Sequence, residues 1–179
     1  MLIVIILVVL VGWFVLSYNG LIAKKQRVKE GASDILVQLK RRFDLIPNLI
    51  ETVKGYSGHE TETLEKVTAM RSRLNDAESI LERDHIGSEV SKEIKGFMIN
   101  VESYPDLKAN TNFLKLQEEL SDTENKIQAS RRFYNGVVKE YNISIASIPT
   151  NFIAKIMAYK DEPLLDIKEE EKENVKVSF

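Results

Sequence analysis

The chain begins with an uncharged apolar run, and this run constrains the fold more than any other feature. Residues 2–16 read LIVIILVVLVGWFVL, and thirteen of these fifteen positions are Leu, Ile, Val or Phe. No side chain that is charged at neutral pH precedes Lys24, so about 22 uncharged residues reach roughly 33 Å as a helix, enough to cross a bilayer core of about 30 Å. On an insertion scale the thirteen residues sum to about −4 to −8 kcal/mol in favour of the membrane. We therefore predict a transmembrane anchor over residues 1–23. Its membrane-spanning side chains are Leu2, Ile3, Val4, Ile5, Ile6, Leu7, Val8, Val9, Leu10, Val11, Trp13, Phe14, Val15 and Leu16.

A cleaved secretory signal is the alternative interpretation of the same run. Three features speak against it. No basic residue precedes the run, the run is longer than a typical signal core, and residues 17–19 do not form a small-x-small cleavage site. We therefore expect the anchor to remain attached to the chain.

Basic residues gather directly after the anchor. An excess of positive charge on one flank predicts that this flank lies in the cytoplasm. The same side chains are candidates for contact with anionic lipid headgroups. We therefore expect a single-pass cell-membrane protein whose bulk is cytoplasmic. The topology-setting or headgroup-binding residues are Lys24, Lys25, Arg27 and Lys29.

Beyond the anchor, apolar residues recur in alternating steps of three and four, which is typical of helices that pack along a seam. The rhythm follows residues 28–46, 49–81, 90–104 and 113–148. Prolines at positions 47, 105 and 149 are predicted to separate helices, and residues 82–89 are predicted to form a connector. These segments predict an all-α fold, in which the transmembrane helix is followed by an elongated antiparallel four-helix up-and-down bundle over residues 24–159.

The C-terminal region divides into two parts. Phe152, Ile153, Ile156 and Met157 are spaced as in a short amphipathic helix, which either caps the bundle or lies on a partner. Capping is the simpler interpretation. Residues 160–179 are rich in acidic side chains and are predicted to form a flexible, solvated tail.

Composition and motifs argue against several classes of function. The chain has 25 basic and 27 acidic side chains, a balance that excludes a simple basic nucleic-acid binder, and it has no cysteine. No phosphate-binding loop, nucleophile elbow or dinucleotide fingerprint occurs. His59 and Glu60 lack the second histidine that a helical zinc site requires, because Thr63 stands one turn on. We expect no metal, no cofactor, no small-molecule substrate and no enzymatic activity.

Polar residues recur on or beside the apolar seams. A buried polar group costs about 1 to 3 kcal/mol unless it is paired, so we expect bonds between helices, with Arg41, Arg42, Arg131 and Arg132 as available partners. Such a network would fix the register of the helices. A binding site for a partner or ligand is the alternative. The predicted network residues are Asp34, Asp44, Asn48, His59, Glu60, Asn112, Glu124, Asn135 and Asn142.

Three segments resemble the LemA family of bacterial and archaeal membrane proteins. They are residues 34–60, DILVQLKRRFDLIPNLIETVKGYSGHE, residues 104–113, YPDLKANTNF, and residues 121–142, SDTENKIQASRRFYNGVVKEYN. The resemblance covers about residues 18–150 in the family's order. It implies an N-terminal membrane helix, a four-helix bundle and a membrane-associated, non-catalytic role. Some members are linked to membrane shaping or to a membrane metalloprotease encoded nearby, which makes such a protease a possible partner.

Three functional hypotheses follow. In the first, the anchored bundle is a non-enzymatic scaffold or interaction module, which needs an exposed patch that core packing does not explain. In the second, the protein self-assembles into a homo-oligomer that organises or remodels the membrane, with coiled-coil-like contacts between its helices. The third is an enzyme, which would need titratable groups clustered in a concave pocket.

Overall fold

The structure is a computed structural model that describes residues 1–53, 61–100 and 104–166, with side chains described in these ranges except at 61–65 and 100. Within these ranges every regular element is a helix. The all-α prediction is therefore confirmed. The helices are α1 (Leu2–Val53), α2 (Thr61–Asp76), α3 (Ile80–Asn100), α4 (Pro105–Lys108), α5 (Thr111–Ala146) and α6 (Thr150–Ile156).

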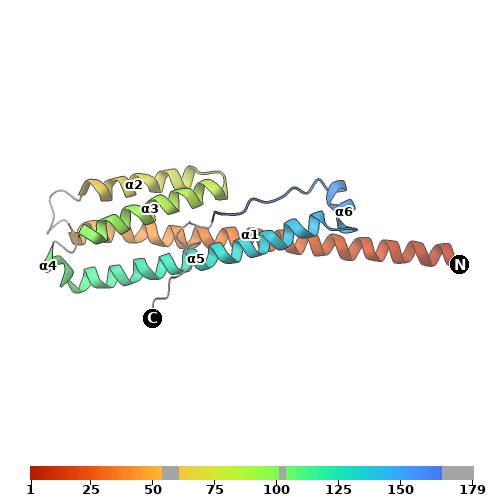
Figure 1. The fold of residues 1–179 in the computed structure, drawn as a ribbon, viewed down its shortest axis with the longest axis horizontal. Coiled ribbons are helices and arrows are strands. Elements are labelled where there is room, and N and C mark those ends of the chain that lie inside the picture. Colours follow the sequence, from red (N-terminus) through yellow and green to blue (C-terminus); the bar gives the residue numbers. More distant parts are fainter. Residues whose placement is uncertain (54–60, 101–103, 167–179) are drawn as a thin grey trace, which may run out of the picture.

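The longest helix, α1, joins the predicted anchor to the first helix of the bundle in one rod of 52 residues, or about 78 Å. Its most apolar stretch has a mean hydropathy of 2.5, and none of that stretch is buried. This N-terminal part extends beyond the other helices (Figure 1). From Leu21 onward, one side of α1 is buried against its neighbours.

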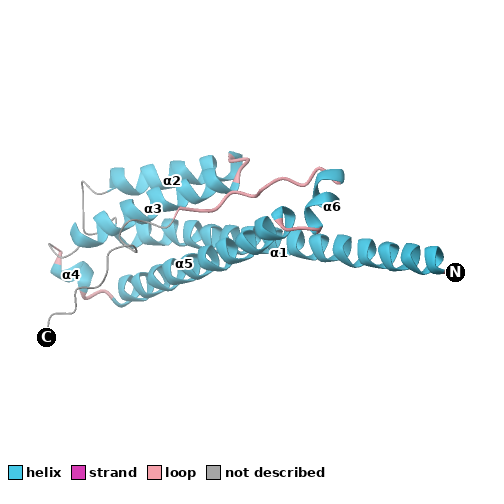
Figure 2. Ribbon diagram, turned by 45° about the vertical axis from the view of Figure 1, so that its right-hand side comes forward, coloured by secondary structure: helices cyan, strands magenta, loops and turns pink. Residues whose placement is uncertain are grey.

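The other helices pack around α1 in two zones. α5 runs antiparallel to α1 along most of its own length, whereas the hairpin of α2 and α3 covers only the part of α1 remote from the N-terminus (Figures 1 and 2). We call the zone with α2 and α3 the distal half; it includes residues 35–53 of α1 and 113–131 of α5. The proximal half contains residues 18–31 of α1, residues 134–145 of α5, and the chain from α6 to residue 166.

Two glycines allow the helices of the bundle to approach closely. A Cβ atom at Gly31 would lie 3.2 Å from the Cα atom of Tyr134, where α1 meets α5. A Cβ atom at Gly87 would lie 2.5 Å from a terminal carbon of Leu39, where α3 meets α1. A larger side chain at Gly31 would meet the backbone of α5, and one at Gly87 would require the Leu39 side chain to shift.

The predicted helix boundary at Pro47 is wrong, because α1 continues through this proline to Val53. Pro47 is exposed, while Phe43, Ile46 and Leu49 around it on the packed side of the helix are buried. A proline inside a helix costs about 3 kcal/mol. Each fully buried large apolar side chain stabilises the folded state by about 1.5 to 3 kcal/mol. Burial along the seam therefore outweighs the local preference of proline to end the helix.

The predicted connector at residues 82–89 is also wrong, because these residues belong to α3. The chain turns instead between Asp76 and Ile80, where the Ser79 hydroxyl accepts a hydrogen bond from the backbone N–H of Glu82 at 3.1 Å. Ser79 thus satisfies a free N–H at the start of α3.

The long C-terminal helix begins later than Pro105. Pro105 opens the four-residue α4, and Asn110 then caps α5 by accepting bonds from the backbone N–H groups of Asn112 and Phe113. α5 ends at Ala146, shortly before Pro149, and has 36 residues.

Candidate functional site

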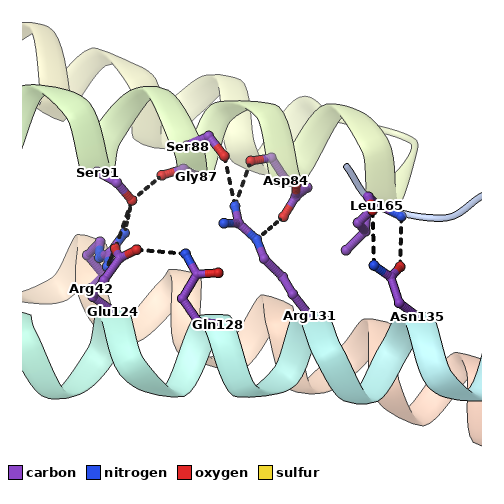
Figure 3. A network of polar contacts seen from close by, with 10 residues as sticks. All are labelled: Arg42, Asp84, Gly87, Ser88, Ser91, Glu124, Gln128, Arg131, Asn135 and Leu165. Carbon is purple, nitrogen blue, oxygen red and sulfur yellow. Dashed lines mark hydrogen bonds and ion pairs between the residues drawn. The ribbon is translucent and has the colours of Figure 1, made fainter. Parts of the chain in front are cut away.

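A buried ion pair joins three helices in the distal half (Figure 3). Arg42 on α1 is only 2% exposed. It donates one bond to the Ser91 hydroxyl on α3 at 2.5 Å and another to the Glu124 carboxylate on α5. Gln128, one turn further along α5, donates to the second oxygen of Glu124 at 2.9 Å. These bonds connect α1, α3 and α5 through one charged centre.

The charge state of Glu124 follows from this environment. Burial raises the pKa of a carboxyl group, but the opposite charge of Arg42 and the bonds from Gln128, Arg42 and Ser91 outweigh burial and lower the pKa of Glu124 to about 2. Burial also lowers the pKa of Arg42, and the charge of Glu124 opposes that shift. Because a guanidinium does not lose its proton in proteins, both partners are charged at neutral pH.

A second buried ion pair lies further along the contact between α3 and α5. Arg131 on α5 donates from Nε to the Asp84 carboxylate at 2.5 Å. Its terminal nitrogen donates to the Ser88 hydroxyl at 2.8 Å and to the backbone carbonyl of Asp84 at 3.2 Å. Figure 3 shows both arginines directed at α3 along this contact. Charged side chains therefore bridge α3 to the rest of the bundle.

An open groove of about 580 Å³ lies beside the Arg42 ion pair, between α3 and α5. Most of its lining surface is apolar, and Ile99 is 71% exposed. Arg42 and Glu124 also line it. The groove is lined by Arg42, Ser91, Ile94, Lys95, Met98, Ile99, Gln117, Leu120, Ser121 and Glu124.

In the proximal half, residues 159–166 run back along α5, and we call this segment the strap (Figure 1). The side-chain amide of Asn142 donates to the Glu162 carbonyl at 2.8 Å and accepts from the Glu162 N–H at 3.0 Å. Asn135 forms the same pair of bonds with Leu165, at 3.0 and 2.8 Å. Tyr134 donates to the Pro163 carbonyl at 3.0 Å. The described start of the predicted tail is thus hydrogen-bonded to α5.

The basic residues after the apolar run mostly contact protein groups. Lys24 donates to the Ser144 hydroxyl on α5, and Arg27 forms an exposed ion pair with Glu140 at 3.5 Å. The Lys25 ammonium lies 5.0 Å from the centre of the Tyr159 ring. Lys29 is exposed. This belt of charge marks where α5 and the strap reach the end of the apolar rod.

Comparison with known proteins assigns the chain to a family. The LemA family profile matches residues 31–179. The chain belongs to the LemA family. A LemA protein of Metamycoplasma hominis is 29% identical over 164 residues, which cover 89% of this chain and 74% of that protein. Two magnetosome proteins are also similar: MamQ 1 of Paramagnetospirillum magneticum and MamQ of Magnetospirillum gryphiswaldense are each 21% identical, covering 86% of this chain and 66% of their own lengths.

The match to the LemA family includes both buried ion pairs, the groove and the strap, while the apolar run lies N-terminal to the matched residues. Family membership and an apolar N-terminal helix together fit a membrane-anchored helical protein. The LemA resemblance stated from the three sequence segments is therefore confirmed.

The residues of the predicted interhelical network take different positions in the structure. Glu124 lies at the centre of the buried ion pair, whereas Asn135 and Asn142 bond the strap rather than another helix. Asp44 pairs with Arg71 at 2.7 Å on the surface between α1 and α2. Asp34, Asn48 and Asn112 are exposed, and His59 and Glu60 lie outside the described residues.

Several central residues were not predicted as network members. Asp84, Ser88 and Ser91 were missed, two of them because they fell in the predicted connector. Arg42 and Arg131 were expected only as available partners. Both arginines continue the three-and-four rhythm of the buried positions around them, so an arginine on an apolar seam was the signal that could have placed them at the centre.

The remaining chemistry of the bundle gives no metal site in the residues that the structure describes. No group of three or more His, Cys, Asp or Glu side chains there could hold an ion. The strongest features are therefore the groove, the two ion pairs and the strap.

Proposed function

We propose that this protein is a single-pass membrane protein whose bundle acts as a non-enzymatic scaffold, holding a partner protein in the groove between α3 and α5. The observation that carries the proposal is an open, mostly apolar groove on a bundle whose central helix continues directly into a membrane-length apolar segment. The positive belt after that segment supports a cytoplasmic location for the bundle.

Helix α1 holds the groove at a fixed distance from the apolar segment. Leu21, where α1 first becomes buried, and Arg42, which lines the groove, lie on the same helix. Their separation of 21 residues corresponds to about 31 Å along the helix axis. Because the described helix has no break between them, a partner in the groove would be held at that distance from the apolar segment.

The groove suits an amphipathic helix of a partner. Its apolar walls can bury the apolar face of such a helix, and its polar rim carries Lys95, Gln117 and Ser121. Exposed Ile99 is not explained by core packing.

Site-specific photo-crosslinking in intact cells tests the proposal. A photoreactive amino acid replaces Ile99 in the groove or, as a matched control, Leu81, an exposed apolar residue at the other end of α3. An adduct with another protein from position 99 and not from position 81 would support the scaffold. A ladder of homo-oligomers from position 99 would instead support self-assembly, and equal labelling from both positions would contradict a role for the groove.

A further inference from the structure

The bare part of α1 is shorter than a bilayer core. The unbroken run of exposed positions on α1 ends at Leu16, because Ser17 and Tyr18 are half-buried and Leu21 is fully buried. Fifteen residues extend about 22 Å, whereas the hydrocarbon core is about 30 Å thick. The rod can therefore cross the core only if the part of the protein that surrounds residues 17–21 also reaches the membrane.

That surrounding part includes α6, which contacts α1 and runs across its direction in both views (Figures 1 and 2). Ile153 and Ala154 are buried on the inner side of α6. Ile148, Phe152 and Ile156 are 80%, 59% and 74% exposed. Phe152 and Ile156 are four residues apart and lie on one face of α6, and Ile148 is exposed in the turn before it, so this region presents uncovered apolar side chains at the base of the rod.

Three lysines lie on α6 or contact residues that are close to it in the chain. The ammonium of Lys25 contacts Tyr159, which follows α6 closely in the chain, and Lys24 contacts Ser144 near the end of α5. Lys155 on α6 is exposed. Lysine side chains at this level can extend their ammonium groups to lipid phosphates while their stems lie along apolar surface.

We propose that α6 is a second membrane contact, a collar that lies in the interface of the bilayer leaflet where α1 leaves it. Ile148, Phe152, Ile156 and the half-exposed Met157 enter the boundary between headgroups and acyl chains, while Ile153 and Ala154 remain packed on the bundle. An interfacial helix of this kind buries its apolar face by about 5 to 10 Å, which matches the roughly 8 Å by which the bare rod falls short of the core thickness. The inference rests on the proposed transmembrane anchor and adds a lipid contact that fixes the depth and orientation of the bundle.

Tryptophan quenching by brominated lipids tests the collar, because Trp13 is the single tryptophan of the chain. The native full-length protein in phosphatidylcholine and phosphatidylglycerol liposomes reports on the anchor through Trp13. The double variant Trp13→Phe, Phe152→Trp reports on the collar. A matched control, Trp13→Phe with Leu114→Trp, places the reporter at an exposed apolar position near the distal start of α5.

We expect quenching of Trp13 by bromines placed deep in the acyl chains. Bromines near the headgroups should reduce the emission of a tryptophan at 152 by about twofold, as for a side chain buried in the interface, and leave a tryptophan at 114 unchanged. If Trp13 is quenched but the tryptophan at 152, like that at 114, is not, then α6 does not enter the interface, and the proposed transmembrane anchor is still supported. If Trp13 is not quenched, the proposed transmembrane anchor itself fails. Should Phe152→Trp disturb folding, seen by circular dichroism, Ile156→Trp in the same background gives the same expectation.

Discussion

The two halves of the bundle use polar groups in different ways. In the distal half, charged side chains are buried between helices, as Arg42 with Glu124 and Arg131 with Asp84. In the proximal half, the charged pair of Arg27 and Glu140 is exposed, and the hydrogen bonds to the strap come from the neutral side chains of Asn135, Asn142 and Tyr134. Both halves share the same central pair of helices, α1 and α5.

The difference follows from what covers that helix pair. α3 adds a third wall only in the distal half (Figure 1), and there it excludes water from the arginines. The strap is extended chain, whose backbone N–H and C=O groups have no partners within a helix and must find them on α5. The asparagine side chain carries both N–H donors and an acceptor oxygen, so a single side chain satisfies both groups of a strap residue. Buried ion pairs therefore connect helices in the distal half, whereas neutral side chains form the hydrogen bonds to the strap in the proximal half.

The largest expected effect comes from removing one charge of a buried pair. Glu124→Leu leaves Arg42 charged and without its carboxylate, so we expect a loss of about 3 kcal/mol in the free energy of unfolding, near the lower end for such pairs because Glu124 is partly accessible. Denaturant unfolding of the detergent-solubilised protein, followed by circular dichroism, measures this loss.

Two further variants sharpen that result. Adding Arg42→Leu to Glu124→Leu removes the uncompensated charge and should recover most of the stability. Arg27→Leu, in the exposed pair with Glu140, should cost less than about 1 kcal/mol. Equal losses from Glu124→Leu and Arg27→Leu would contradict the distinction between the two halves.

Acid should weaken the distal half through the same residue. The pKa of Glu124 is lowered from 4.5 to about 2 in the folded protein, so the unfolded chain binds its proton more readily. The stabilisation from Glu124 is therefore complete above about pH 5 and declines as the pH falls from 4.5 towards 2. Melting temperatures across this range, compared with those of Glu124→Gln, measure the effect. If the difference in melting temperature between the two proteins stays constant from pH 7 to pH 3, Glu124 is not the cause of the loss of stability in acid.

Removing an amide from the proximal half should have a smaller and more local effect. Asn135→Leu leaves the backbone N–H and C=O of Leu165 without their partners, at a cost of about 1 to 3 kcal/mol for docking the strap. Hydrogen exchange at residues 164–166 should become faster, while exchange in α1 and α3 stays unchanged. Asn125→Leu, at an exposed position on α5, is the control. A loss of protection throughout the bundle would mean that the strap is part of the common folding unit.

The smallest expected effect concerns the turn that follows α6. Ala158 has a φ of 53°, and the N–H of Tyr159 bonds the Ala154 carbonyl at 2.9 Å, an arrangement that usually has glycine at this position. The left-handed conformation costs an L-residue about 1 to 2 kcal/mol. Glycine itself loses about 0.5 to 1 kcal/mol in backbone entropy. Ala158→Gly should therefore slow hydrogen exchange around α6 by up to about fivefold, equivalent to roughly 1 kcal/mol. Faster exchange would contradict this account of the turn.

Local signals in the sequence predicted some boundaries and misled at others. The pattern Ser79-x-x-Glu82 is typical of a helix start and would have placed the turn before α3 correctly, whereas the glycine and serine at 87 and 88 suggested a connector. Pro47 failed as a stop signal because the buried positions of α1 continue past it to Leu49 and Val53. In both places the packed seam, rather than the punctuating residue, decided the structure.

The sequence by itself determined the helical class, the apolar rod, the LemA resemblance and the amphipathic character of α6, because each depends on periodicity, length or motifs along the chain. Tertiary structure alone decided which polar residues are buried, that Asn135 and Asn142 face an extended segment, and where a groove remains open. The physical reason is that burial depends on what lies across from a residue. Residues such as Arg42, Ser91 and Glu124 are far apart in the chain, and only packing brings them together.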